Sequence, residues 1–517
     1  MENRMRIGLF DPGMTYLHRV GLAGLYMTLK YFDEIGQTFP GLSWELSDRH
    51  VELFWDEKPK KWLPPLLQES FGCDKAGLID FAAHRKHPMG DLERIAFSES
   101  LRMTFLQHNK QNMIPKGTPD NRQNVSFGDK TVAVRYKPFK GRYAHAVCSG
   151  NVLNSKGEFK PTVRIKGWLF PGAAERHGSM AVTSVDERPE RALCLIFAPV
   201  ASLYYRLHHR GLDGKPDKRR GYAVVFPHVV RLSLYNRCYL RYLGAPIKDL
   251  SADGLGDASL SALLVLKAQE ALDDLGVVGS TAITMGTIAW SSQQRTRTDV
   301  ETIEKVHQQQ LVLFDIARRM MPNRVIIREQ KPTKKSPTPD AGYFVATSQC
   351  RGLFADNIAN GRDWFLGFSQ LMLSKELYRV VSYEKGGLSK MVAQMPWPNE
   401  ADKKLVEAVH AAIRNRLGAV AAQAKQRGEK MPFDREFERM RTGLMRAKNA
   451  ETLRAELADL FARGRPNAPL QASWKDLLPV FSGPNWQRTR DLALLALASY
   501  KGKEIEDEKQ TSEKMED

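Results

Sequence analysis

Two pairs of polar residues have types and spacing that suit metal binding or catalysis. His84 and His87 could share one face of a helix, but no carboxylate or cysteine stands beside them to complete a metal site. Glu158 and Lys160 form an E-x-K pair of the kind found in nucleases of the restriction type, although the nearest upstream acid, Asp129, lies on a basic stretch. The sequence therefore predicts no metal site and no cofactor.

A pair of adjacent histidines offers a different chemistry. His208 and His209, followed by Arg210, could cleave RNA by general acid–base catalysis without a metal. The other interpretation is that they are loop residues near a phosphate. The chain has no GxxxxGK[ST] phosphate loop, HExxH motif, GxSxG elbow or His-Asp dipeptide. A metal-independent RNA-cleaving or RNA-modifying enzyme using His208 or His209 stays the alternative.

Composition indicates what such a protein binds. The chain has 517 residues, with 77 Lys and Arg against 59 Asp and Glu, so its formal charge is +18. This excess favours a polyanion, most often nucleic acid. The five cysteines are widely scattered, and the chain shows neither a signal peptide nor an apolar run of the roughly 18 to 20 residues that a membrane span needs. We therefore expect a cytoplasmic protein with no membrane partner.

The positive charge is concentrated in two windows. Residues 101–170 hold 13 Lys and Arg against 3 Asp and Glu, and residues 206–241 hold nine against two. Together they carry nearly the whole net charge, so we expect them to build the binding surface. Two alternatives stay open: either window is only a solvated basic face, or the protein is a helical scaffold that binds only protein.

The elements that must position these residues follow an α+β pattern and then an all-α pattern. Helices are expected at 15–35, 75–86, 91–109, 256–275 and about 363–385. Strands are expected at 131–137, 162–168, 191–200, 221–232, 281–290 and 324–329. In the first helix, Gly21, Ala23 and Gly24 would allow another backbone to approach closely.

After residue 391 the strand signals stop and four apolar stripes of helical spacing follow. Asn449 can cap the third helix, Gly464 can end it, and Asn485 can start the fourth. These patterns predict an α+β N-terminal body followed by an all-α C-terminal helical bundle. The expected domains are a body over 1–385, a linker over 386–400, a four-helix bundle over 401–502 and a disordered acidic tail over 503–517.

Two segments come close to nucleic-acid motifs. RGYAVVFP (220–227) begins like the RNA-recognition-motif signature, but Val224 stands where an aromatic residue should stack a base, so a buried strand is the better interpretation. The segment 106–124 interleaves side-chain amides with cations. Amides can donate and accept at base edges while cations hold phosphates. A polar loop after a helix is the alternative.

At both ends the chain resembles a known family. LHRVGLAGLYMTL near the start and NWQRTRDLALLALASYKG near the end resemble the type I-A/I-B large subunits of the CRISPR effector complex Cascade. The resemblance implies a non-catalytic subunit near the 5′ handle of the guide RNA, which reads the motif flanking the target DNA and helps open the duplex. Its implied partners are the guide RNA, the target duplex and displaced strand, the other backbone and small subunits, and the helicase-nuclease.

On that resemblance, site residues are assigned by charge and residue type. The motif readers would be Gln107, Asn109, Gln111, Asn112, Gln123 and Asn124. The phosphate contacts would be Lys110, Lys116, Arg122, Arg135, Lys137, Lys140, Arg142, Lys215, Lys218, Arg219 and Arg220.

The stretch EKGGLSKM (384–391) has two interpretations. Gly386 could cap the preceding helix. Alternatively, Lys385, Gly386 and Gly387 can be encoded by a purine-rich ribosome-binding sequence just upstream of Met391, since some members of the resembled family make their small subunit by internal translation. Copies of the bundle would then track single-stranded DNA. Their cations would be Arg414, Arg416, Lys425, Arg427, Arg439, Arg441 and Arg446.

Overall fold

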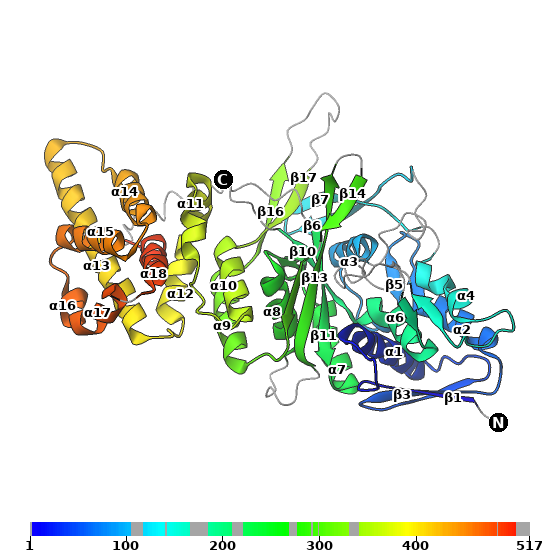
Figure 1. Ribbon diagram of the computed structural model, residues 1–517. Helices are drawn as coiled ribbons and strands as arrows, with labels where there is room; N and C mark the ends of the chain where they lie inside the picture. Colours follow the sequence, from blue (N-terminus) through cyan, green and yellow to red (C-terminus); the bar gives the residue numbers. More distant parts are fainter. Residues whose placement is uncertain are drawn as a thin grey trace. The chain divides into compact units, whose positions relative to one another are not determined.

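The described chain forms two compact units. The computed structural model describes residues 3–104, 117–139, 142–165, 185–208, 221–267, 277–290, 293–297, 299–329, 341–482 and 484–502. Unit 1 contains the described residues up to Leu311 together with Asn323–Thr347, and unit 2 contains Val312–Pro322 and the described residues from Ser348 onward. Unit 1 mixes helices with small sheets and unit 2 consists mostly of helices, so the predicted fold class is confirmed (Figure 1).

Two helices of unit 1 pack with their backbones in close contact. These are α1 (Tyr16–Ile35) and α6 (Pro189–Ala201). A Cβ atom added at Gly21 would lie 2.0 Å from the carbonyl oxygen of Cys194, and one added at Gly24 would lie 2.2 Å from that of Phe197. The predicted role of these glycines is therefore confirmed. The predicted strand over 191–200 is wrong, because α6 is buried along nearly its whole length and shows no amphipathic period in the sequence.

The largest sheet of unit 1 has the strand order β12-β10-β11-β13-β14, and β15 pairs with β13. Its strands are β10 (Leu203–Leu207), β11 (Gly221–Val229), β12 (Ser251–Ala252), β13 (Val277–Trp290), β14 (Gln293–Arg297) and β15 (Val300–Ile303). The neighbouring helices are α7 (Leu232–Leu243) and α8 (Leu255–Leu266). All pairings are antiparallel except that of β10 with β12. The strands predicted in 221–232 and 281–290 are confirmed.

Tyrosines of α7 hydrogen-bond the backbone where α6 leads into strand β10 of this sheet. The hydroxyls of Tyr235 and Tyr239 donate hydrogen bonds to the carbonyl oxygens of Ala201 and Ser202, at 2.5 and 3.0 Å. Both rings are fully buried, and burial holds their pKa values well above the usual value. The junction between α6 and β10 is thus satisfied without water.

The N-terminal part of unit 1 adds a three-stranded antiparallel sheet and short elements around it. The sheet has the order β1-β3-β2. The elements are β1 (Asn3–Gly8), β2 (Leu42–Leu46), β3 (His50–Trp55), α2 (Pro59–Ser70), β4 (Phe71–Cys73), β5 (Ile79–Phe81), η1 (Ala82–His84), η2 (Ala144–Val147), α4 (Ser149–Val152), β8 (Val163–Ile165) and β9 (Val185–Glu187). The helix predicted over 75–86 is wrong, because Asp74 accepts the backbone N–H of Leu78 and Gly77 adopts a φ of +75°, so the chain turns back as the β4–β5 hairpin.

Two further hairpins share one hydrophobic cluster with α3 (Asp91–Met103). Their strands are β6 (Asn121–Phe127), β7 (Lys130–Tyr136), β16 (Arg324–Glu329) and β17 (Ala341–Ala346). Figure 1 shows β7 and β17 near one another beside the large sheet, and the two strands are in contact. The strands predicted over 131–137 and 324–329 are confirmed, and α3 confirms a helix in 91–109 that ends at Met103.

Unit 2 is organised around its last helix, α18 (Trp486–Ser499), which is buried from Asp491 to Ser499. The other elements are α9 (Gln308–Met320, whose last nine residues belong to unit 2), α10 (Gln349–Ala359), η5 (Phe368–Met372), α11 (Lys375–Tyr383), α12 (Lys385–Gln394), α13 (Glu400–Arg427), α14 (Phe433–Arg446), α15 (Ala450–Arg463), α16 (Ala468–Ala472) and α17 (Trp474–Ser482). α18 contacts α13, α14, α15 and α17 and also η5 and α12. The core of unit 2 therefore extends upstream of the expected bundle.

The helix ends of unit 2 agree with several sequence signals. The side chain of Asn449 accepts the backbone N–H of Thr452 at 2.8 Å, and α15 ends at Gly464. Of the residues beyond 400 that the structure describes, six segments are helical where four were expected. The two additional helices are α16 and α17, whose apolar residues are interrupted by Pro469 and Pro479 and give no long stripe.

The stretch EKGGLSKM lies inside the packed structure of unit 2. Glu384 is half-buried and accepts hydrogen bonds from the Ser348 hydroxyl (2.5 Å) and the backbone N–H groups of Gln349 (2.9 Å) and Cys350 (3.2 Å). It thus binds the first turn of α10, while burial raises its pKa. Gly386 lies within α12, so the interpretation that it ends a helix is wrong. Residues 386–394 of the expected linker are helical.

Candidate nucleic-acid interface

The β6–β7 hairpin presents a basic outer face. Its two-residue turn contains Gly128 at a φ of +57°, which suits glycine. Residues alternate between the two faces of a strand, and Val132 and Val134 point into the shared cluster. Arg122 and Arg135 are exposed on the opposite face. The hairpin core therefore fixes the direction in which both guanidinium groups project.

Arg122 and Arg135 are direct cross-strand partners. Like charges that stand directly opposite one another destabilise a sheet pair, and an anion bound near them would offset part of this repulsion. Asn124 lies on the same outer face and is exposed, whereas Gln123 points to the other face and is half-buried. Of these two expected motif readers, only Asn124 shares the basic face.

The β16–β17 hairpin carries cations that the sequence reasoning missed. Arg324 and Arg328 are exposed and alternate with Val325 and Ile327, which pack on the shared cluster. The guanidinium carbon of Arg328 lies 4.7 Å from the centre of the Phe344 ring. A cation beside a half-buried aromatic ring suits a nucleotide, because the guanidinium can pair with a phosphate and stack on a base. The alternation R-V-I-I-R was the available signal.

The described residues that flank the two basic windows lie together. Glu99 on α3 accepts a hydrogen bond from the hydroxyl of Tyr222 at 3.2 Å and lies 3.9 Å from the guanidinium of Arg206. Tyr343, which hydrogen-bonds Arg206, also lies against Phe127 of β6 with the ring centres 5.6 Å apart. Burial, followed by the charge of Glu99, raises the pKa of Tyr222 to about 12. Described residues of the two windows and of their flanks are therefore connected through Glu99 and Tyr343.

Two of the seven cations assigned to the single-strand path have structural partners. Arg416 forms an ion pair with Glu436 at 3.0 Å. Arg441 is 8% exposed, binds the carboxylate of Glu438 and donates to the carbonyl oxygen of Met372. Both are already neutralised within unit 2, which the sequence could not show because each partner is chosen by the packing of the helices.

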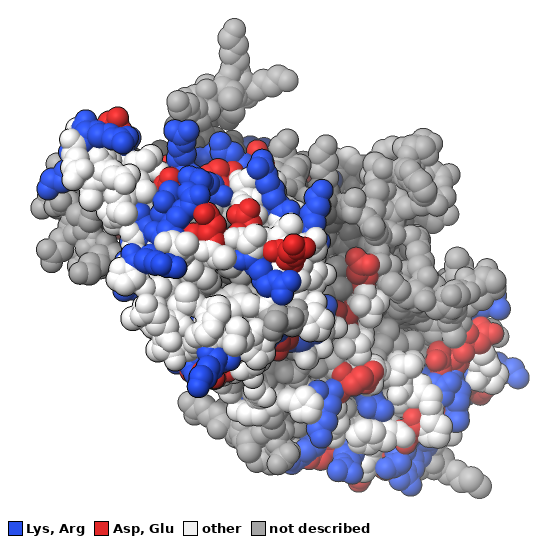
Figure 2. Space-filling view, turned by 60° about the vertical axis from the view of Figure 1, so that its left-hand side comes forward, with Lys and Arg blue, Asp and Glu red and all other residues white. Residues whose placement is uncertain are grey.

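The other cations of this path are exposed. They are Arg414, Lys425, Arg427, Arg439 and Arg446. Lys425 and Arg427 lie in the last turn of α13 and Arg446 in the last turn of α14, where a cation also stabilises the helix dipole. Figure 2, in which the left-hand part of Figure 1 comes forward, shows Lys and Arg side chains gathered on this side with Asp and Glu between them.

Polar residues first considered for metal binding or catalysis form hydrogen bonds to the backbone instead. His84 binds the carbonyl oxygen of Val200 at 2.9 Å through Nε2, and burial lowers its pKa to about 4. Lys160 donates to the carbonyl oxygens of Gly150 and Asn151 at 3.0 and 2.9 Å. The described residues contain no group of three or more His, Cys, Asp or Glu arranged to hold a metal. No helix among them is long and apolar enough to cross a membrane.

Comparison with known proteins identifies the family. A family model described as the DevT N-terminal domain matches residues 6–196, and one described as the DevT C-terminal domain matches residues 393–517. The CRISPR-associated protein Cas8a1/Csx13 of Myxococcus xanthus (strain DK1622) is 31% identical over 534 residues, covering 96% of this chain and 89% of that protein. The chain belongs to the Cas8a1/Csx13 family. It is a Cas8-like large subunit of a type I CRISPR effector complex, as the resemblance at its two ends predicted.

Several expected site residues of this large subunit lie outside the described residues. These are Gln107, Asn109, Lys110, Gln111, Asn112, Lys116, Lys140, Lys215, Lys218, Arg219, Arg220 and His209. Lys137 and Arg142 are described and exposed, directly after β7 and before η2. His208 follows β10, and its backbone N–H donates to the carbonyl oxygen of Ala252 at 2.9 Å.

Met391 of the large subunit is fully buried in α12. A chain starting there would lack the first six residues of α12, from Lys385 to Lys390. The family's C-terminal domain nevertheless begins at residue 393, two residues after Met391. The boundary that family comparison draws and the proposed internal start therefore almost coincide in the sequence.

Proposed function

We propose that this large subunit recognises the motif flanking the target DNA and stabilises the opened strands with the β6–β7 face and the two basic windows. The observation that supports this most is the pairing of Arg122 with Arg135 on an exposed face of a hairpin whose Phe127 contacts Tyr343, which in turn hydrogen-bonds Arg206 of the second window. A surface of this kind suits phosphates of a duplex or of the guide handle. Asn124, on the same face, is positioned to reach a base edge.

The division of labour is that guide pairing supplies sequence specificity and this subunit supplies a short motif check and charge. On this proposal it contacts the 5′ handle of the guide RNA, the target duplex, the backbone and small subunits and the helicase-nuclease, and it performs no catalysis. The exposed cations of unit 2 would follow the displaced strand. All five cysteines are free thiols, which suits a reducing cytoplasm.

We also propose that residues 391–517 are made separately as the small subunit. The start of the family's C-terminal domain at residue 393 supports this. In the full-length chain, η5 and α12 cover one side of α18. A chain starting at Met391 would lack η5 and the first part of α12, so this side of α18 would be exposed. A separate copy would therefore need another protein surface at that position.

The test uses the assembled complex with Arg122→Ala and Arg135→Ala combined. Target binding is measured across salt concentrations and across flanking motifs. Each lost phosphate contact should reduce the log–log salt slope by about 0.9, so the double variant should reduce it by roughly two, with the motif preference unchanged. Asn124→Ala should relax the motif preference instead.

Arg49→Ala serves as the matched control, since Arg49 is also exposed in unit 1 but precedes β3, outside both hairpins. An unchanged salt slope in the double variant, with the same slope in Arg49→Ala, would show that the β6–β7 face is merely solvated.

A further inference from the structure

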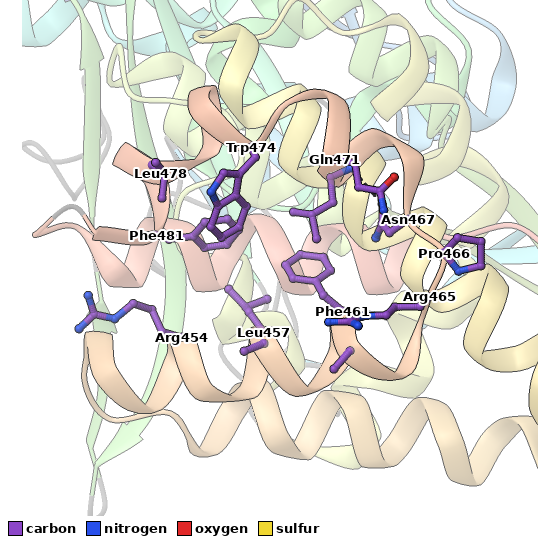
Figure 3. A pocket seen from close by; sticks show the side chains of 13 residues that line it. Arg454, Leu457, Phe461, Arg465, Pro466, Asn467, Gln471, Trp474, Leu478 and Phe481 are labelled. Carbon is purple, nitrogen blue, oxygen red and sulfur yellow. Dashed lines mark hydrogen bonds between the residues drawn. The ribbon is translucent and has the colours of Figure 1, made fainter.

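An open apolar groove of about 1030 Å³ runs along α15 in unit 2. Leu457 and Phe461 of α15 face Trp474 and Phe481 of α17 across it (Figure 3). The ring centres of Phe461 and Phe481 are 6.1 Å apart, and those of Trp474 and Phe481 are 6.0 Å apart. The aromatic rings thus form a continuous floor.

The groove is accessible to solvent although its lining is apolar. Trp474 is 50% exposed and Leu478 is 44% exposed. Neither side chain is needed to close the core beneath, because Leu457 and Leu477 of the same helices are fully buried. An exposed apolar hollow of this size is typical of a surface that another molecule covers.

The charges around the groove select the occupant. Its charged lining residues are Arg454 at one end and Arg465 at the other (Figure 3). Neither forms an ion pair with any residue that the structure describes. The carboxylates of Glu456 and Asp459 lie on the other side of α15, where they line a separate, smaller hollow. The groove therefore favours a ligand with an apolar centre and negatively charged ends.

The dimensions favour a peptide. Arg454 and Arg465 are 11 positions apart on and just after α15, which is about 16 Å along a helix axis. The volume is at the upper limit for a single small molecule, which occupies roughly 300 to 1,000 Å³. Three leucines, two alanines and a proline share the lining with the aromatic rings, so aliphatic side chains fit better than a row of stacked bases.

We propose that this groove docks an acidic amphipathic helix of about three turns from a neighbouring protein. Apolar side chains at helical spacing would pack on Leu457, Phe461, Trp474 and Leu478, and carboxylates at its two ends would pair with Arg454 and Arg465. The inference goes beyond the proposed nucleic-acid role and does not depend on it, because it uses none of the residues assigned to DNA or RNA.

The experiment measures binding of labelled probes to the full-length protein by fluorescence anisotropy. The probes are a helical peptide of about 12 residues with leucines on one face and glutamates near both ends, the same peptide with lysines in place of glutamates, and a short oligothymidine. We expect the acidic peptide to bind at least tenfold more tightly than the lysine peptide. Leu478→Glu and Arg454→Glu should each weaken this binding tenfold or more.

Arg435→Glu is the matched control, since it makes the same charge change as Arg454→Glu on an exposed arginine of α14, outside the groove and outside the residues assigned to the single-strand path. Equal binding of the two peptides, or no binding of the acidic one, would overturn the proposal. Oligothymidine binding that Leu478→Glu abolishes would assign the groove to single-stranded DNA instead. If deleting residues 503–517 is required before the acidic peptide binds, the occupant is the chain's own acidic tail and the proposed partner is excluded.

Discussion

Replacing Asp491 tests whether α18 and the segment before α11 form one cooperative core. The two carboxylate oxygens of Asp491 accept the backbone N–H groups of Gly367 at 2.7 Å and Ser369 at 3.0 Å. The side chain is 4% exposed. Asp491→Ala therefore leaves two N–H groups without an acceptor in a site that water does not reach.

The expected cost follows from these two hydrogen bonds. Leaving a buried polar group unsatisfied costs about 1 to 3 kcal/mol, so the loss of both acceptor oxygens should destabilise unit 2 by roughly 3 to 4 kcal/mol. This corresponds to more than a hundredfold change in the opening equilibrium. Asp491→Asn keeps one carbonyl acceptor and should cost about half as much.

Native-state hydrogen exchange followed by mass spectrometry measures this locally. Amides of α18 and of η5 should exchange about a hundredfold faster in Asp491→Ala, while those of α1 in unit 1 should not change. Asp459→Ala is the control, because Asp459 forms an exposed i,i+4 ion pair with Arg463, and such a pair contributes about 0.3 to 0.5 kcal/mol. Acceleration below tenfold in α18, or acceleration confined to η5, would refute the single core.

Three further outcomes are expected. Unit 1 should lose roughly 3 kcal/mol of stability as the pH falls from 6.5 toward 4, because burial lowers the pKa of His84 to about 4, so that in this range the histidine is protonated in the unfolded chain but not in the folded one. Denaturation midpoints of wild type and His84→Gln, measured across this pH range, check this. Equal acid sensitivity of the two proteins would contradict it. Gly21→Ala should destabilise unit 1 by about 3 kcal/mol or more, because the added Cβ atom would overlap a carbonyl oxygen of α6. Gly150→Ala is the control and should be nearly neutral in the same denaturation assay, because a Cβ atom at Gly150 meets no other atom within 4 Å. Synonymous recoding of Lys385–Gly387 should abolish the second product that starts at Met391; this product has 127 of the 517 residues and therefore a mass of about 14 of the 58.5 kDa, which mass spectrometry detects. A second product that persists after recoding would show that its translation does not depend on these codons. If the native gene yields no second product, internal translation is excluded.

The sequence predicted elements well where local pattern and tertiary environment agree. The exposed alternation in 131–137 and the capping residue Asn449 are both local signals, and both are confirmed. Burial on all sides removes such signals. Helix α6 reads as a strand because its apolar run has no polar face, while its contact with Gly21 was predictable from the small residue itself.

Site residues were predictable by type but not by direction or partner. Gln123 and Asn124 are adjacent amides, yet a strand sends them to opposite faces. Arg416 and Arg441 look like free cations, but helix packing supplies a carboxylate to each. Arg328 was missed because its proposed role in nucleotide binding depends on the ring of Phe344, which is 16 positions away in the sequence. Contacts of this kind are set by the tertiary fold.

The position of α18 at the centre of unit 2 has a consequence for synthesis. A ribosome that has completed residue 348 must still add more than a hundred residues before α18 emerges, which takes roughly 7 to 30 s at about 5 to 20 residues per second. During that time the apolar faces of α10 to α17 have no central helix to pack against. Nascent chains of this subunit should therefore depend on holding chaperones late in translation, and a ribosome that stalls just before Trp486 should release a product with a folded unit 1 and an uncovered, aggregation-prone unit 2.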